Sequence, residues 1–125
     1  MGLHHVVMFS FKADTSAEAV MGVHGRETQA CDEMAGLAKA CVHPSTAKPY
    51  IKSLTGGKDI SIEGMQGERQ NGMTHAFVVE FESVADRDFY VNGDETHRAF
   101  VEKYVASEGA IVAKVLVVDF VPGEL

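Results

Sequence analysis

The chain has 125 residues, of which 46% are hydrophobic, and a formal net charge of −7. This length and apolar content fit one ordinary domain with a real core, so we expect a single domain over residues 1–125. An acidic chain without a block of Lys or Arg lacks the electrostatic footprint for binding nucleic acid. The N-terminal apolar run is too short for a signal segment or a membrane span, which predicts a cytoplasmic protein without a membrane partner.

The first predicted element is a strand from Leu3 to about Lys12. By the two-residue period of a strand, one face carries His5, Val7, Phe9 and Phe11, and the other carries His4, Val6, Met8 and Ser10. Both faces are therefore largely apolar. The adjacent histidines His4 and His5 point in opposite directions, which makes them a poor metal-binding pair, and we expect no metal site in the chain.

A long helix is predicted to follow and to reach about Cys41. Thr15 and Glu18 have the spacing of a capping box at its start. Cys31 and Cys41 lie on this helix about 15 Å apart, given a rise of about 1.5 Å per residue, so they cannot form a disulfide with each other. We interpret both cysteines as small apolar residues of the buried helix stripe.

The middle of the chain predicts a short strand and then a long loop. Pro49 precedes a strand from Tyr50 to Thr55, and a proline at its start favours a sheet edge. The glycine-rich segment 56–72 is longer than most loops, so we expect it to be the most mobile internal segment. Its Gly56-Gly57-Lys58 is not a phosphate-binding loop, because Asp59 stands where that motif requires Ser or Thr.

The segment after this loop combines a strand with two short helices. The strand runs from Met73 to Glu82, and Ser83 with Asp86 has the capping-box form at the start of the first helix. Asn92-Gly93 ends that helix, and Asp94 is placed to cap the second. One face of the second helix carries His97, Phe100, Val101, Tyr104 and Val105.

A final strand is predicted from Ile111 to Val121. One of its faces carries Val115, Val117 and Asp119, and the other carries Leu116, Val118 and Phe120. The order strand, helix, strand, strand, helix pair, strand predicts the α+β class with a ferredoxin-like βαββαβ arrangement and a four-stranded antiparallel sheet. We place the strand that ends at Glu82 in the centre and the strand that begins at Tyr50 at an edge.

The helices of such a domain cover only one face of the sheet. The other face would leave exposed a contiguous apolar patch larger than monomers usually show. We therefore infer a homodimer that packs sheet against sheet. The patch is formed by Val6, Met8, Ala76, Val78, Leu116 and Val118.

The face towards the helices is a candidate small-molecule site, because it combines an apolar wall with a few polar groups. The expected substrate-binding residues are His5, Val7, Phe9, Phe77, Phe100, Val115 and Val117. His97 and Tyr90 are the candidate catalytic residues, since a histidine titrates near neutrality and a tyrosine donates a hydrogen bond. The sequence pattern does not distinguish a functional role of these polar residues from an ordinary structural role.

Several separated segments carry a resemblance to a known family. In chain order they are HVVMFSFK, GGKDISIEG, THAFVVEFES, DRDFY, THRAFVEKY and VLVVDF, which together span nearly the whole chain. This pattern resembles the stress-responsive A/B barrel family, also called Dabb or dimeric α+β barrel domains. The resemblance implies that two sheets pair to close a barrel. Family members often carry a proline two residues before the histidine that matches His97, whereas this chain has Glu95 there.

The resemblance also implies an activity. Some plant and fungal members are cofactor-free polyketide cyclases, a kind of lyase, in which the residue matching His97 is the base of an aldol closure. The residue matching Tyr90 binds and polarises the substrate carbonyl, and His5 matches a pocket histidine. Many other members are known only as stress-responsive proteins, so the alternative is a non-catalytic or ligand-binding protein. A cavity of about 300 Å³ or more beside His97 would favour the enzyme. A weaker third reading is a haem- or quinol-handling monooxygenase.

Overall fold

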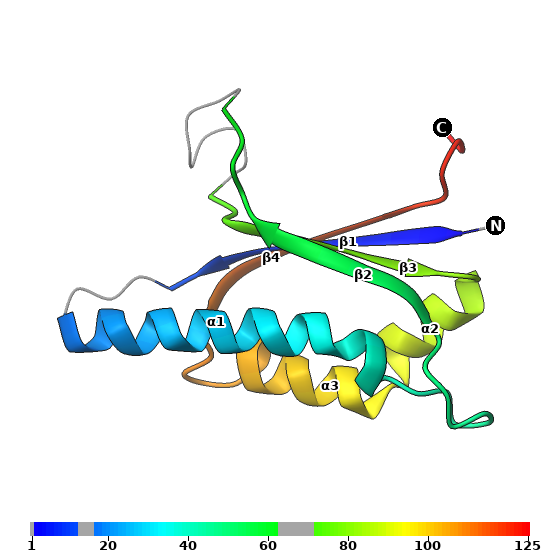
Figure 1. Cartoon of the computed structure of the whole chain (residues 1–125), viewed down its shortest axis with the longest axis horizontal. Helices are drawn as coiled ribbons and strands as arrows, with labels where there is room; N and C mark the ends of the chain where they lie inside the picture. The colour runs from blue at the N-terminus through cyan, green and yellow to red at the C-terminus, as the bar shows by residue number, and fades with distance from the viewer. Residues whose placement is uncertain (1, 13–16, 63–71) are drawn as a thin grey trace.

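The computed structural model describes residues 2–12, 17–62 and 72–125, without the side chains of 17–24. Figure 1 shows two layers, a sheet of four strands and a layer of helices that all lie against the same face of that sheet. The opposite face of the sheet has no described element packed over it. The arrangement confirms the predicted ferredoxin-like fold.

The strands lie in the order β2-β3-β1-β4, and every neighbouring pair is antiparallel. The strand bounds are β1 Leu3–Phe11, β2 Ile51–Lys58, β3 His75–Phe81 and β4 Val112–Phe120. The helices are α1 Ala17–Ala40, α2 Val84–Asn92 and α3 Glu95–Val101, and α3 continues into a short π-helical stretch, η1 Glu102–Ala106. As predicted, β3 lies inside the sheet and β2 at its edge.

The helix starts follow the predicted capping chemistry. Ser83 precedes α2, and its side chain accepts a hydrogen bond from the backbone N–H of Asp86. Gly93 caps the end of α2, and the Asp94 carboxylate accepts hydrogen bonds from the backbone N–H groups of Thr96 and of His97 at the start of α3. Local side chains thus satisfy N–H groups that a helix start leaves unpaired. The predicted capping residue Thr15 lies outside the described residues.

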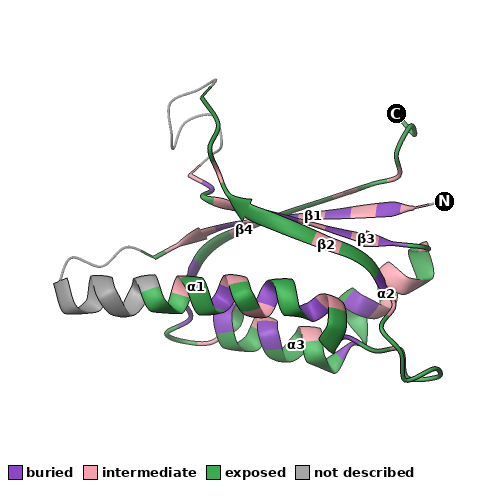
Figure 2. Ribbon diagram, viewed as in Figure 1, coloured by how far each residue is buried: buried purple, intermediate pink, exposed green. Residues whose placement is uncertain are grey.

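The two faces of the sheet differ in burial. Figure 2 shows alternating buried and half-buried residues along β1, as expected when every second side chain points to the helices. The helix-facing side is closed by a single core cluster, which includes Val7, Phe9, Val79, Phe81, Met34, Leu37, Tyr90, Phe100 and Tyr104. On the other side of β4, Leu116, Val118 and Phe120 are 38%, 55% and 44% exposed.

The second strand is longer than predicted. β2 extends to Lys58 and pairs Gly56 with Phe77 and Gly57 with Ala76 of β3, so Gly56-Gly57-Lys58 is strand and not loop. A Cβ atom on Gly56 would overlap both the Phe77 ring and the Ala76 carbonyl. Glycine at this position therefore lets the ring lie over the strand. Residues 63–71 lie outside the described part of the chain, so the expected mobility of the loop stays a prediction.

Both cysteines are free thiols, Cys41 buried and Cys31 half-buried on α1. Both pack in or against the apolar core, as expected, although α1 ends at Ala40 and Cys41 directly follows it. Among the described residues, no helix has both the length and the apolar character needed to cross a membrane.

The close approach of Gly56 to Phe77 gives a stability prediction. Gly56→Ala should lower the free energy of unfolding by about 1–3 kcal/mol, because the added methyl group must displace the ring or the β3 backbone. Gly57→Ala is the matched control, since a Cβ there meets nothing within 4 Å, and should change stability by less than about 0.5 kcal/mol. Urea unfolding measures both, and equal effects of the two variants would contradict this account.

Candidate functional site

A cavity of about 510 Å³ lies between the sheet and the helices α2 and α3. It differs from two larger hollows, one of about 970 Å³ between α1 and α3 and one of about 650 Å³ between α1 and β2. Those hollows are lined mainly by exposed residues, whereas this cavity brings buried histidine and tyrosine rings to an apolar wall. It is therefore the strongest candidate for a small-molecule site.

The structure brings eight of the nine predicted site residues to this one cavity. They are His5, Val7, Phe9, Tyr90, His97, Phe100, Val115 and Val117. Phe77 is the exception, and its placement in the site was wrong: it lines the hollow between α1 and β2. The reason is the strand order, because the sheet residues that line the cavity all belong to β1 and β4, while Phe77 lies on β3 towards β2.

His97 lies in the first turn of α3 and is half-buried. Its ring centroid is 3.9 Å from that of Tyr90, with 31° between the two planes. Burial lowers the pKa of His97 below its ordinary value of 6.5; the neighbouring His5 adds to this, and the Tyr90 backbone and the Asp94 carboxylate partly offset it. The imidazole is therefore neutral at pH 7, the state that a general base requires.

Tyr90 lines the cavity, but its hydroxyl oxygen is fully buried. The side chain is fully buried, and its hydroxyl oxygen has no hydrogen-bond partner among the described residues. Burial raises the pKa of Tyr90, and the nearby Cys41 and Asp94 raise it further. The sequence predicted a hydroxyl that donates to a substrate carbonyl, whereas in this arrangement the oxygen is too deeply buried to meet a ligand.

Asp94 is the centre of a buried polar cluster that holds the start of α3. Its Oδ1 accepts from the backbone N–H groups of Thr96 and His97 at 2.9 and 3.2 Å, and its Oδ2 accepts from the Tyr50 hydroxyl at 2.5 Å. Burial and the Asp94 carboxylate raise the pKa of the Cys41 thiol to about 12, so this cysteine is no nucleophile at neutral pH. The sequence predicted the cap but not the contribution of Tyr50.

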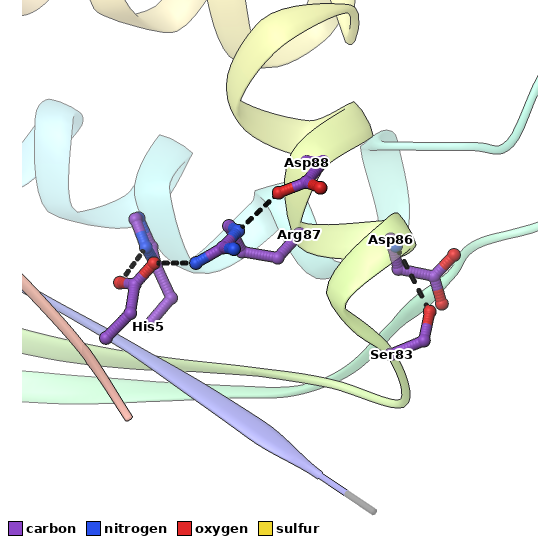
Figure 3. Close-up of polar contacts among 6 residues, drawn as sticks. His5, Ser83, Asp86, Arg87 and Asp88 are labelled. Atoms are coloured by element: carbon purple, nitrogen blue, oxygen red, sulfur yellow. Dashed lines mark hydrogen bonds and ion pairs between the residues drawn. The ribbon is translucent and has the colours of Figure 1, made fainter. Parts of the chain in front are cut away.

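A second polar cluster lines the cavity itself and is drawn in Figure 3. The ring nitrogen Nδ1 of His5 lies 2.6 Å from Oδ1 of Asp119, and Nη1 of Arg87 donates to Oδ2 of the same carboxylate at 2.6 Å. Nε of Arg87 also donates to Asp88 at 2.7 Å. His5 on β1 and Asp119 on β4 are directly paired in the sheet register.

Arg87 and Asp119 are site residues that the sequence prediction missed, and both line the cavity. The sequence pattern did indicate Asp119 as a candidate. It lies on the same strand face as Val115 and Val117, and a carboxylate is unusual on a face that is expected to be buried and apolar. The pattern did not indicate Arg87, since a charged residue on a short helix is usually solvated. The apolar residues Met34, Val91, Val101 and Val105 also line the cavity.

The burial of His97 predicts its titration. Because its pKa in the folded protein is lowered from 6.5, the unfolded chain binds a proton at His97 before the folded protein does. The part of the unfolding free energy due to this group is therefore fully present above pH 6.5 and is lost as the pH falls below it. Two-dimensional NMR of the ring should give a midpoint below that of a denatured reference, and a midpoint at or above the reference would contradict the placement of His97.

Comparison with known proteins supports the fold and the family. The chain matches the stress responsive A/B barrel domain (Dabb) over residues 3–122. Among curated proteins, no sequence matches this chain.

Solved structures are similar over nearly the full length. An Arabidopsis thaliana protein is 26% identical with a TM-score of 0.59, over 98% of this chain and 97% of that one. A dimeric ferredoxin-like protein of unknown function from Jannaschia sp. is 23% identical with a TM-score of 0.64, over 96% and 98%. The hydroxynitrile lyase of Passiflora edulis is 18% identical with a TM-score of 0.61, over 99% and 95%. With the family match over almost all residues, the chain belongs to the stress-responsive A/B barrel (Dabb) domain family.

Proposed function

We propose that this protein catalyses aldol-type formation or cleavage of a carbon–carbon bond in a small, mostly apolar carbonyl compound, with His97 as the general base. The observation that carries the proposal is a histidine with a lowered pKa in the wall of an apolar cavity of about 510 Å³. This volume exceeds the roughly 300 Å³ expected of a small-molecule site. The proposed activity uses the protein's own side chains.

The chemistry needs only one base that stays neutral at the working pH. His97 takes a proton from a methylene between two carbonyl groups, and the electron pair of that C–H bond forms the new C–C bond to the carbon of a third carbonyl group. The carbonyl oxygen becomes an alkoxide and takes the proton back from His97. The enolate and the imidazolium that form attract each other strongly in this cavity, because an apolar wall screens charges poorly.

Two relationships support this reaction class. The family that the chain belongs to includes cofactor-free polyketide cyclases, which close rings by an aldol step. The Passiflora edulis protein of similar fold is a hydroxynitrile lyase. Cleavage of a hydroxynitrile is the reverse kind of step: a base removes the O–H proton, the C–C bond breaks, and cyanide leaves with the electron pair. In both reactions, a C–C bond between a carbanion and a carbonyl carbon is formed or broken.

The cavity wall indicates the size and polarity of the substrate. Val7, Phe9 and Phe100 form a buried apolar side, and Val115 and Val117 form the side along β4. Val117 is 51% exposed, so the cavity opens to solvent along this edge strand. A flexible apolar chain could enter there and fold against the aromatic rings, which would bring its reacting carbons together.

The second candidate function is a binding protein that holds the same kind of ligand without turnover. One observation favours it: the Tyr90 hydroxyl lies too deep to polarise a substrate carbonyl. The proposal therefore assigns Tyr90 to the wall, where its ring packs on His97, and assigns proton transfer to His97 alone.

We also propose that the active form is a homodimer built on the open face of the sheet. Leu116, Val118 and Phe120 are partly exposed on that face, next to the half-buried Val6 and Val78. An exposed apolar sheet face of this kind usually marks a protein interface. The Jannaschia sp. structure of similar fold is described as dimeric. The cavity lies on the opposite side of the sheet, inside each protomer.

The activity prediction compares variants of His97 and Tyr90, whose rings are adjacent. His97→Gln should lower the rate by about 10²–10⁴-fold, because the proton acceptor is lost. Tyr90→Phe should stay within a few-fold of the wild type, because it removes a hydroxyl that meets no ligand. The probes are a linear tetra-β-ketide thioester, followed by product chromatography, and mandelonitrile, followed by benzaldehyde absorbance.

A wild-type rate that survives in His97→Gln would overturn the assignment of the base. Wild-type protein that binds both probes and converts neither would favour the binding-protein alternative. Circular dichroism of each variant controls for loss of fold.

The dimer prediction compares a negative charge placed on the open face of the sheet with one placed at the start of α2. Val78→Asp should dissociate the dimer, because it buries an unpaired carboxylate in the interface at a cost of about 2–5 kcal/mol. Val84→Asp is the matched control, since Val84 is exposed at the start of α2, where an acidic residue is tolerated. Sedimentation equilibrium measures both, and a wild-type monomer at micromolar concentration would contradict the proposal.

A further inference from the structure

One ring nitrogen of His5 is hydrogen-bonded to a carboxylate. The Nδ1 atom lies 2.6 Å from Oδ1 of Asp119, and an ionised carboxylate only accepts hydrogen bonds. Nδ1 must therefore carry the hydrogen. In the neutral ring this leaves the lone pair on Nε2, which is the less common tautomer of a free histidine.

The other nitrogen of the His5 ring is available to a ligand. Nε2 has no hydrogen-bond partner among the described residues. In that part of the chain, the fully buried side-chain atoms that lack a partner are the Tyr90 and Tyr104 hydroxyl oxygens, and Nε2 is not among them. Nε2 is therefore not fully buried. His5 lines the cavity, so its Nε2 reaches the open volume. Edge-on contacts with the rings of Tyr90 and Phe81, at 5.7 and 6.3 Å between centroids, hold the imidazole in place.

The carboxylate that fixes His5 is itself held in position. Arg87 donates to the second oxygen of Asp119 at 2.6 Å, and its Nε is bound to Asp88, so the guanidinium is anchored at both ends (Figure 3). These groups come from β4 and α2. The remaining polar residues that line the cavity are Tyr90 and Asn92 of α2 and His97 of α3. A chain of this kind sets the tautomer and orientation of a histidine.

We propose that Asp119, held by Arg87, is a positioning residue that keeps the lone pair of His5 Nε2 in the cavity, so that the site selects ligands with a hydroxyl or enol O–H. Hydroxylated aromatic compounds, enolised β-dicarbonyl compounds and hydroxynitriles all carry such a group. A ligand that lacks it would leave a buried acceptor unpaired, which is the main source of discrimination at such sites. This inference rests on the cavity being the ligand site of the proposed function, but it requires no turnover.

The first test reads the tautomer directly by ¹⁵N NMR of the His5 ring. Wild-type protein should show the Nδ1–H form at a pH where the ring is neutral. In Asp119→Asn, the amide oxygen should turn to Arg87 and the amide nitrogen to His5, which converts the ring to the Nε2–H form. Asp86→Asn is the matched control, since Asp86 lies on α2 with Arg87 but its side chain lies apart from Arg87 in Figure 3.

The second test compares 3-propylphenol with its methyl ether by NMR titration. Wild-type and Asp86→Asn proteins should bind the phenol about tenfold more tightly, the effect of one buried hydrogen bond. Asp119→Asn should bind the two within about twofold of each other. An Nε2–H ring in the wild type, equal binding of both probes, or no phenol binding at millimolar concentration would each overturn the inference.

The outcome is separable from that of the proposed function. A protein that converts no substrate but shows the tautomer and the phenol preference would lose the proposed reaction and keep this inference. Loss of the preference in His97→Gln, with the preference intact in Asp119→Asn, would assign the O–H acceptor to His97 and overturn it.

Discussion

The buried carboxylate of Asp94 holds together the elements on which the candidate site depends. It caps α3 through two backbone N–H groups and accepts the hydroxyl of Tyr50, the residue just before β2. The Asp94 carboxylate thus lies close to the start of α3, to the residue before β2 and to Cys41, which directly follows α1. Loss of this carboxylate would leave several buried donors unpaired, at about 1–3 kcal/mol for each. Because His97 is in the first turn of α3, its position in the cavity follows from this cap.

Two histidines reach the same cavity in different surroundings. His97 has no carboxylate within hydrogen-bond distance of its ring among the described residues, and burial lowers its pKa. His5 is bound through Nδ1 to Asp119, which is bound in turn to Arg87. One ring is thus kept neutral by its environment, and the other is kept in one orientation by a partner. Sites that handle protons commonly combine groups in such contrasting environments.

The strand order divides the sheet into two halves that pack differently against the helices. The helix α1 packs against β2, and the Phe77 ring fills the space over Gly56 on that side. The cavity is left over β1 and β4, under α2 and α3. The opposite face stays apolar and partly exposed along β4. The cavity and the exposed apolar face therefore lie on opposite sides of the sheet.

The sequence by itself determined the order of elements, the caps at Ser83 and Asp94, and the face on which His5, Val115 and Val117 lie. Periods of two and 3.6 residues and capping side chains are local, so a single chain reveals them. Only the tertiary structure decided that Asp119 and Arg87 join His5, that Phe77 lies outside the cavity, and that the Tyr90 hydroxyl is fully buried. Each of these depends on strand register or on how a ring packs against a distant element. A sequence pattern shows which face a side chain occupies but not which distant partner it meets there.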